Sequence, residues 1–147
     1  MDAWALRRSV YSHLAATGRA PDGTVLARWV AADGGDPSTV DALLRELAER
    51  HALVLDARGE IRMALPFSAT PTDNRVAAAD GSWWANCAWD ALAIPAALGI
   101  DAAIDARWLD TWEDVGLAVR DGELTHTTGF VHFVVPAAHW WDDIVET

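Results

Sequence analysis

Apolar residues recur at helical spacing near the start of the chain. Leu6, Val10 and Leu14 are four residues apart, so they would line one face of a first helix, and Gly18 follows as a stop signal. A second group of apolar residues at 25–30 predicts a second helix, which a Gly-Gly pair would end. The chain therefore begins with helical structure.

A third helix and a hairpin complete the first part of the chain. Asp36 is a suitable N-cap and Pro37 suits the first helical position, with an amphipathic stripe behind them. Residues 52–65 then form two apolar runs around a turn at 56–59, which is typical of a β-hairpin. Three helices and a hairpin predict a winged-helix-like module over residues 1–66.

The middle of the chain changes character twice. Residues 67–80 contain proline, threonine, asparagine and aspartate, and we expect an irregular connection there. Alanine and leucine dominate after Asn86, which predicts a helix that Gly99 ends. Pro95 lies inside this helix and is expected to kink it.

The last part of the chain, within residues 81–147, predicts short strands. Residues 115–119 lead into an Asp-Gly turn, a strong hairpin signal, and residues 130–135 have the pattern of a strand that is apolar on both faces. Residues 139–145 predict a short terminal helix. The predicted fold class is therefore α+β, with the winged-helix-like three-helix module first. A small mixed or antiparallel sheet with one cysteine-bearing helix follows.

The charge of the chain argues against two classes of partner. There are 11 basic residues, all of them arginine, against 22 acidic ones, which gives a formal net charge of −11. Such a surface repels phosphate backbones and anionic lipid, so we expect neither nucleic acid nor a membrane as partner. No targeting segment or membrane-length apolar run is visible. We therefore expect a cytoplasmic location, where a thiol stays reduced.

The single cysteine belongs to the most informative pair in the chain. Cys87 and Asp90 are three residues apart, so on a helix they share a face near its N-terminal end. The positive end of the helix dipole favours a thiolate at Cys87, and desolvation would raise the pKa of Asp90. The pair offers a soft nucleophile or metal ligand beside a proton donor. The structural alternative is a small buried thiol and a carboxylate that serves the helix dipole.

The segment around this pair resembles the signature of the alkylmercury (organomercurial) lyase family. A Cys-Ala-x-Asp motif at 87–90 follows a tryptophan and precedes an apolar run with a proline and a glycine. Further similarities occur in the same order: the helical N-terminal region, Thr-Pro-Thr at 70–72 and Val-His-Phe at 131–133. The resemblance implies an alkylmercury-lyase-like fold and lyase activity without a cofactor.

The resemblance also implies roles for individual residues. The Cys87 thiolate would capture the mercury of R–Hg⁺, and Asp90 would manage the proton that goes to carbon. The family has a second cysteine just before Val-His-Phe, where this chain has threonines, among them Thr128. A hydroxyl is a poor ligand for soft mercury. This departure argues against efficient C–Hg cleavage unless an external thiol replaces the second cysteine.

Aromatic residues supply candidate contacts to a substrate. Seven of the nine tryptophans lie in the second half of the chain, where they could wall a flat ligand or fill the core. His132 could assist acid–base chemistry or be a hydrogen-bonded core residue. A zinc site built from Cys87, Asp90 and the histidines would match no standard spacing. The candidate substrate-binding residues are Trp84, Trp89, His132, Trp141 and Thr128.

Three functions stay open on the sequence alone. The first is an enzyme of the organomercurial-lyase type that uses Cys87 and Asp90. The second is a repurposed family member that acts on or binds a non-mercurial small molecule in a tryptophan-lined pocket, for example in a biosynthetic pathway. The third is a non-catalytic protein-interaction module. The expected partners are a small-molecule substrate, an external thiol and a second copy of the chain in a homodimer.

Overall fold

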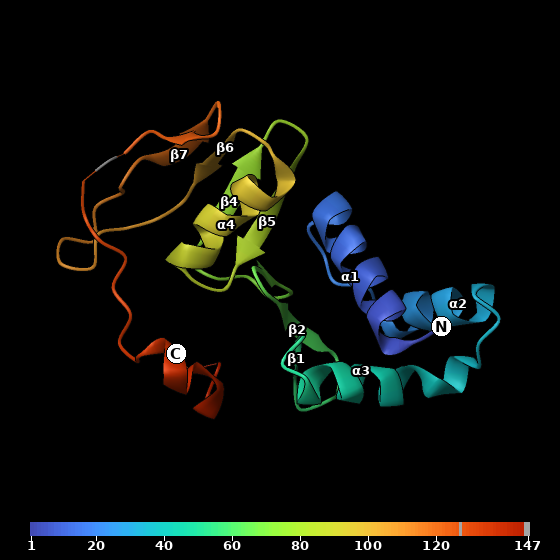
Figure 1. Ribbon diagram of the computed structural model, residues 1–147. Coiled ribbons are helices and arrows are strands. Elements are labelled where there is room, and N and C mark those ends of the chain that lie inside the picture. Colours follow the sequence, from blue (N-terminus) through green and yellow to red (C-terminus); the bar gives the residue numbers. More distant parts are fainter. Residues whose placement is uncertain (127, 146–147) are drawn as a thin grey trace.

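Three helices open the chain in the computed structural model, which describes residues 1–126 and 128–145 (Figure 1). α1 spans Ala3–Thr17, α2 spans Gly23–Ala32 and α3 spans Val40–Glu49, with the 3-10 helix η1, Pro37–Thr39, ahead of α3. Asp36 caps η1 as the sequence predicts, because its side chain accepts the backbone N–H of Ser38. None of the helices in the described ranges has the length and apolar character needed to cross a membrane.

The predicted stripe of α1 forms the centre of the helical core. Leu6, Val10 and Leu14 are at most 1% exposed, and they belong to one buried cluster with apolar residues of α2 and α3. α1 ends where predicted, at Gly18, which adopts the left-handed conformation at φ 68°. Burial of this stripe is what holds the three short helices together.

Eight short strands form one sheet in which every pair is antiparallel. Their order is β1-β2-β3-β5-β4-β6-β7-β8. The sheet therefore includes the β1–β2 hairpin of the first part as well as the strands of the second. The predicted α+β class, with helices first and an antiparallel sheet, is confirmed. The strands are β1 Val54–Leu55, β2 Ile61–Ala64, β3 Phe67–Ser68, β4 Arg75–Ala78, β5 Gly81–Ala85, β6 Ala102–Ile104, β7 Leu117–Arg120 and β8 Glu123–Leu124.

The Asp-Gly turn lies where the sequence predicts it. Arg120 pairs with Glu123, so Asp121 and Gly122 form a two-residue loop between β7 and β8. Both loop residues have positive φ, 49° and 78°. Two consecutive positive φ values match the right-handed twist of the flanking strands, which explains the preference for Asp-Gly at this turn.

Three local predictions fail. Residues 67–80 are not irregular throughout, because they contain β3 and β4, and Val76 of β4 is fully buried between β5 and β6. Residues 130–135 form no strand, and residues 137–142 form the 3-10 helix η2, Ala137–Asp142, instead of a longer α-helix. The apolar pattern reports side-chain character, whereas a strand also needs a partner strand. The domain limits at 66 and 80 stay predictions.

α1 is joined to the centre of the sheet by direct hydrogen bonds. The indole Nε1 of Trp83, on β5, donates to the backbone carbonyls of Leu14 and Ala15, both at 3.0 Å. A Cβ atom placed on Gly18 would lie 2.1 Å from the carbonyl oxygen of Ser82. The end of α1 thus fits tightly against β5, and β5 leads directly into the helix that carries Cys87.

Candidate active site

Cys87 stands at the junction of β5 and α4. α4 spans Ala88–Leu98 and contains Pro95; Gly99 ends it in the left-handed conformation, as predicted. Cys87 is the N-cap residue, with extended backbone at φ −149° and ψ 177°, and its side chain makes no capping hydrogen bond. Asp90 follows in the first turn of the helix. The sharp change from strand to helix therefore presents the thiol and the carboxyl group at the same helix end.

The Asp90 carboxyl group is half-buried and held by a neighbour. The side-chain amide Nδ2 of Asn86 donates to Asp90 Oδ2 at 3.0 Å. Burial raises the pKa of Asp90 above its ordinary value, and the hydrogen bond from Asn86 acts in the opposite direction. The predicted direction of this shift is confirmed, and it favours a carboxyl group that retains a proton.

Asn86 also connects the site to the turn before β3. The same Nδ2 atom donates to the backbone carbonyl of Pro66 at 3.2 Å. The amide oxygen, Oδ1, is buried and has no hydrogen-bond partner among the described residues. The sequence did not point to Asn86, because it lies before the N-cap of α4 and helical spacing does not relate it to Asp90.

The net shift in the pKa of the Cys87 thiol differs from the one expected from the sequence. Burial raises the pKa of Cys87; the backbone N–H of Asp90 lowers it, and the charge of Asp90 raises it. The helix start acts in the predicted direction, because the backbone N–H groups of Trp89 and Asp90 lower the pKa. Burial of Cys87 is the larger effect, so the net shift of the thiol pKa is upward, opposite to the expectation.

Tyr11 and Arg7 of α1 contact each other, and nothing in the sequence pattern announces this pair. The Tyr11 hydroxyl donates to the carbonyl of Ala52 at 3.2 Å, and its ring lies edge-on to Phe67 with centroids 6.4 Å apart. The Arg7 guanidinium lies 4.1 Å from the centre of the Tyr11 ring. Burial raises the pKa of Tyr11, Arg7 lowers it, and the charge of Asp90 raises it. The charge of Asp90 is therefore part of the electrostatic environment of Tyr11.

Trp89 is the candidate binding residue nearest in sequence to Cys87. It is 54% exposed on α4, and its ring meets Phe133 edge-on with centroids 6.2 Å apart. Phe133 in turn lies 5.0 Å from the ring of Trp140. We call Trp89, Phe133 and Trp140 the aromatic cluster; it joins α4 to the C-terminal segment.

The other candidate binding residues are dispersed. Trp84 points to the opposite face of β5 from Trp83, because side chains alternate along a strand, and it lies 6.0 Å from the Arg75 guanidinium. Trp141 stacks on His51. His132 and Thr128 are exposed, and the Thr128 hydroxyl lies 2.9 Å from Nε2 of a nearby histidine, His126. No hydrogen bond or ring contact between described residues joins Trp84, His132 or Thr128 to Cys87 or Asp90.

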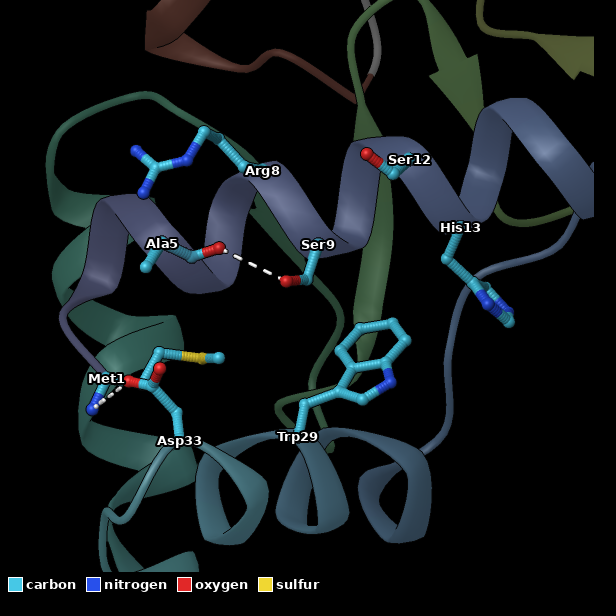
Figure 2. Close-up of a pocket in the computed structure, with 8 residues that line it drawn as sticks. All are labelled: Met1, Ala5, Arg8, Ser9, Ser12, His13, Trp29 and Asp33. Atoms are coloured by element: carbon cyan, nitrogen blue, oxygen red, sulfur yellow. Dashed lines mark hydrogen bonds and ion pairs between the residues drawn. The ribbon is translucent and has the colours of Figure 1, made fainter.

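Three hollows in the surface of the described residues lie away from Cys87 and Asp90. One, of about 550 Å³, lies between α1 and α2, with Trp29 and His13 on its wall and Met1 bound to Asp33 at its end (Figure 2). Two others flank Trp84. None of these three is lined by Cys87 or Asp90. Across residues 1–126 and 128–145, no three His, Cys, Asp or Glu side chains are grouped to hold a metal ion.

Comparisons with known proteins identify the family and the fold. The family model of MerB, alkylmercury lyase, matches residues 67–147. A solved structure, the crystal structure of the mercury-bound form of MerB2, is 28% identical, with a TM-score of 0.67; the similarity covers 86% of this chain and 59% of that one. The chain thus spans less than two thirds of that protein. Curated protein sequences give no match. The predicted resemblance is confirmed: the chain belongs to the alkylmercury lyase family.

Proposed function

We propose that this protein cleaves the carbon–mercury bond of organomercurials with one protein thiol, Cys87, and one proton donor, Asp90. The observation that carries the proposal is the pairing of these groups at the start of α4 in a chain of the alkylmercury lyase family. The raised pKa of Asp90 supports the role of acid, because the carboxyl group keeps a proton to higher pH than usual.

The first step is capture of the substrate. The sulfur of Cys87 displaces the weak ligand of R–Hg–X and loses its proton, which gives Cys87–S–Hg–R. Mercury binds the thiolate form of Cys87, so the thiol proton leaves with the departing ligand X or to solvent. The raised pKa of Cys87 makes this loss of a proton more costly, and the strong bond between sulfur and the soft metal offsets the cost.

The second step breaks the carbon–mercury bond. Asp90 gives its proton to carbon, the electron pair of the C–Hg bond forms the new C–H bond, and R–H leaves. Mercury stays on the Cys87 sulfur with one positive charge, opposite the Asp90 carboxylate. By this point Cys87 has lost one proton at capture and Asp90 has given one proton to carbon.

Product release requires a thiol from outside the chain. Cys87 is the chain's single cysteine, so two external thiols must take Hg²⁺; of the two protons that they give up, one returns to Cys87 and the other to Asp90. Such thiols are abundant in a reducing compartment, which fits the expected cytoplasmic location. We propose that Trp89, in the aromatic cluster, contacts the organic group of the substrate. Trp84, His132, Trp141 and Thr128 stay predictions as binding residues.

The proposal is tested with phenylmercury or methylmercury and excess thiol, with benzene or methane measured in the headspace. Cys87→Ser leaves the chain without a thiol and should lose both capture and release. Asp90→Asn should retain capture, seen as loss of one titratable thiol, and lose hydrocarbon release by at least about 100-fold. Asp80→Asn, an exposed carboxylate, is the matched control. Full release by either site variant would overturn the proposal.

A second candidate function is supported by the absence of a second cysteine and by the exposed aromatic cluster. In this alternative, the family fold binds or transforms a non-mercurial small molecule against Trp89. Tight mercury binding by Cys87 without any hydrocarbon release would favour it over the proposed lyase reaction.

A further inference from the structure

Both N–H protons of the Asn86 side-chain amide take part in hydrogen bonds. Nδ2 donates to the Pro66 carbonyl at 3.2 Å and to Asp90 Oδ2 at 3.0 Å. The reverse orientation of the amide would place Oδ1 against the Pro66 carbonyl, which has no proton to donate. The Pro66 carbonyl therefore fixes which end of the Asn86 amide faces Asp90.

This orientation distinguishes the two oxygens of the Asp90 carboxyl group. Oδ2 must accept, because Nδ2 brings a proton to it; a second proton on the same atom would compete for that place. We infer that Asn86 is a positioning residue that confines the transferable proton of Asp90 to Oδ1. The inference rests on the proposed function, in which Asp90 gives this proton to carbon.

The same contact acts after the proton has left. When the C–Hg bond breaks, its electron pair takes the proton from Asp90 Oδ1, and mercury remains on the Cys87 sulfur. The negative charge left on the carboxylate is then met at Oδ2 by the Asn86 N–H, a hydrogen bond that strengthens as the charge forms. Asn86 thus positions the Asp90 proton and stabilises the Asp90 carboxylate that remains after the transfer, without contacting the substrate.

The buried amide oxygen supports a role beyond packing. An amide kept only for the fold would be expected to satisfy both of its ends, whereas Asn86 Oδ1 has no partner among the described residues. The groups whose pKa responds to the charge of Asp90 are Cys87, at the start of α4, and Tyr11 of α1, whose ring centre lies 4.1 Å from the Arg7 guanidinium.

The chain offers an unusually direct spectroscopic test. It contains two asparagines, Asn74 and Asn86, and no glutamine, so only these two give side-chain NH₂ signals in a ¹⁵N–¹H spectrum. We expect the Asn86 signal to move upfield as the pH falls and Asp90 gains its proton, because a neutral carboxyl group is the weaker acceptor. The Asn74 signal should not follow.

Variants show whether Asp90 or another titrating group moves the Asn86 signal. The pH-dependent movement of the Asn86 signal should disappear in Asp90→Asn and persist in Cys87→Ser. An Asn86 signal that does not move in the wild-type protein, or that moves equally in Asp90→Asn, would overturn the inference. This measurement needs no catalysis, so it holds even if the proposed lyase activity fails.

Kinetic measurements test whether Asn86 positions the Asp90 proton for transfer to carbon. Asn86→Leu keeps the number and branching of the heavy atoms and removes both N–H donors; Asn74→Ala removes the other side-chain amide, which makes no hydrogen bond through its side chain. We expect Asn86→Leu to release hydrocarbon about 10- to 100-fold more slowly while capturing alkylmercury at the wild-type rate. Asn74→Ala should match the wild type in both. Equal slowing of capture and release by Asn86→Leu would indicate a merely structural amide and overturn the inference.

Discussion

The imidazole ring of His51 lies flat on the indole of Trp141, with centroids 4.0 Å apart and planes 5° from parallel. His51 follows α3 and has a positive φ of 56°, whereas Trp141 belongs to η2 near the other end of the chain. In Figure 1 the C-terminal segment, drawn orange to red, runs from the β7–β8 hairpin back toward β1. The stack therefore attaches this segment to the helical part.

Loss of the stack should loosen the C-terminal segment. An aromatic pair of this kind contributes about 0.5–1.5 kcal/mol, so Trp141→Ala should increase local opening of residues 137–142 by about 2- to 10-fold. Hydrogen exchange of these amides measures the change. Trp112→Ala is the control, because Trp112 is 67% exposed and its ring makes none of the aromatic contacts found here. Unchanged exchange in Trp141→Ala would show that the stack does not retain the segment.

Asp90 should lower the stability of the folded protein at neutral pH. Burial raises its pKa in the folded chain above the unfolded value, so the folded state binds the proton more tightly. Stability from this group is complete below the unfolded pKa, about 3.9, and is lost as the pH rises through the folded pKa. Asp90→Asn carries no such loss, so it should be more stable than the wild type at pH 7.

Urea unfolding at two pH values measures this effect. The stability advantage of Asp90→Asn should be present at pH 7 and should shrink as the pH falls below the ordinary aspartate range. Asp80→Asn controls for the change in net charge. An advantage that is the same at both pH values would contradict a raised pKa for Asp90. The result would mark Asp90 as a group retained at a cost in stability, as functional carboxyl groups often are.

The parts of the site that are local in sequence were predictable, and those that depend on distant contacts were not. The Cys87–Asp90 pair is visible because an N-cap residue and the third residue of the helix it precedes are brought to the same helix end. Tyr11 of α1 meets Phe67 of β3 through tertiary packing, and no local pattern encodes that contact. Strand alternation places Trp83 and Trp84 on opposite faces, so neighbouring tryptophans have different roles. The direction of the pKa shift of Cys87 depends on the burial of its side chain, which amino-acid composition does not reveal.

Gly18 should tolerate no side chain. It combines a φ of 68° with a Cβ position 2.1 Å from the Ser82 carbonyl oxygen, which is backbone and cannot rotate away. The left-handed conformation alone costs about 1–2 kcal/mol, so Gly18→Ala should lose at least about 2 kcal/mol of unfolding free energy. Gly23→Ala is the matched control, since a Cβ there meets nothing within 4 Å. Equal stability of the two variants in urea would disprove a tight fit between α1 and β5.

A cysteine at position 128 should reduce the need for an external thiol. Mercury prefers two thiolate ligands, and Thr128 stands in the neighbourhood where the family has its second cysteine. Phe133, five residues later, already touches Trp89 beside Cys87, so the segment is attached near the site. In the free structure the Thr128 hydroxyl instead faces His126, and the segment must turn toward Cys87 to share the metal.

We therefore expect Thr128→Cys to release hydrocarbon faster than the wild type when external thiol is limiting, and to bind Hg²⁺ at least about 10-fold more tightly. The gain in the rate of hydrocarbon release should fade when external thiol is abundant, because thiols from solution then supply the second mercury ligand. Thr111→Cys, an exposed threonine on a separate loop, controls for a second thiol at an unrelated place. If both variants behave alike, the segment around Thr128 does not approach Cys87 during the reaction, and the second metal ligand must come from solution.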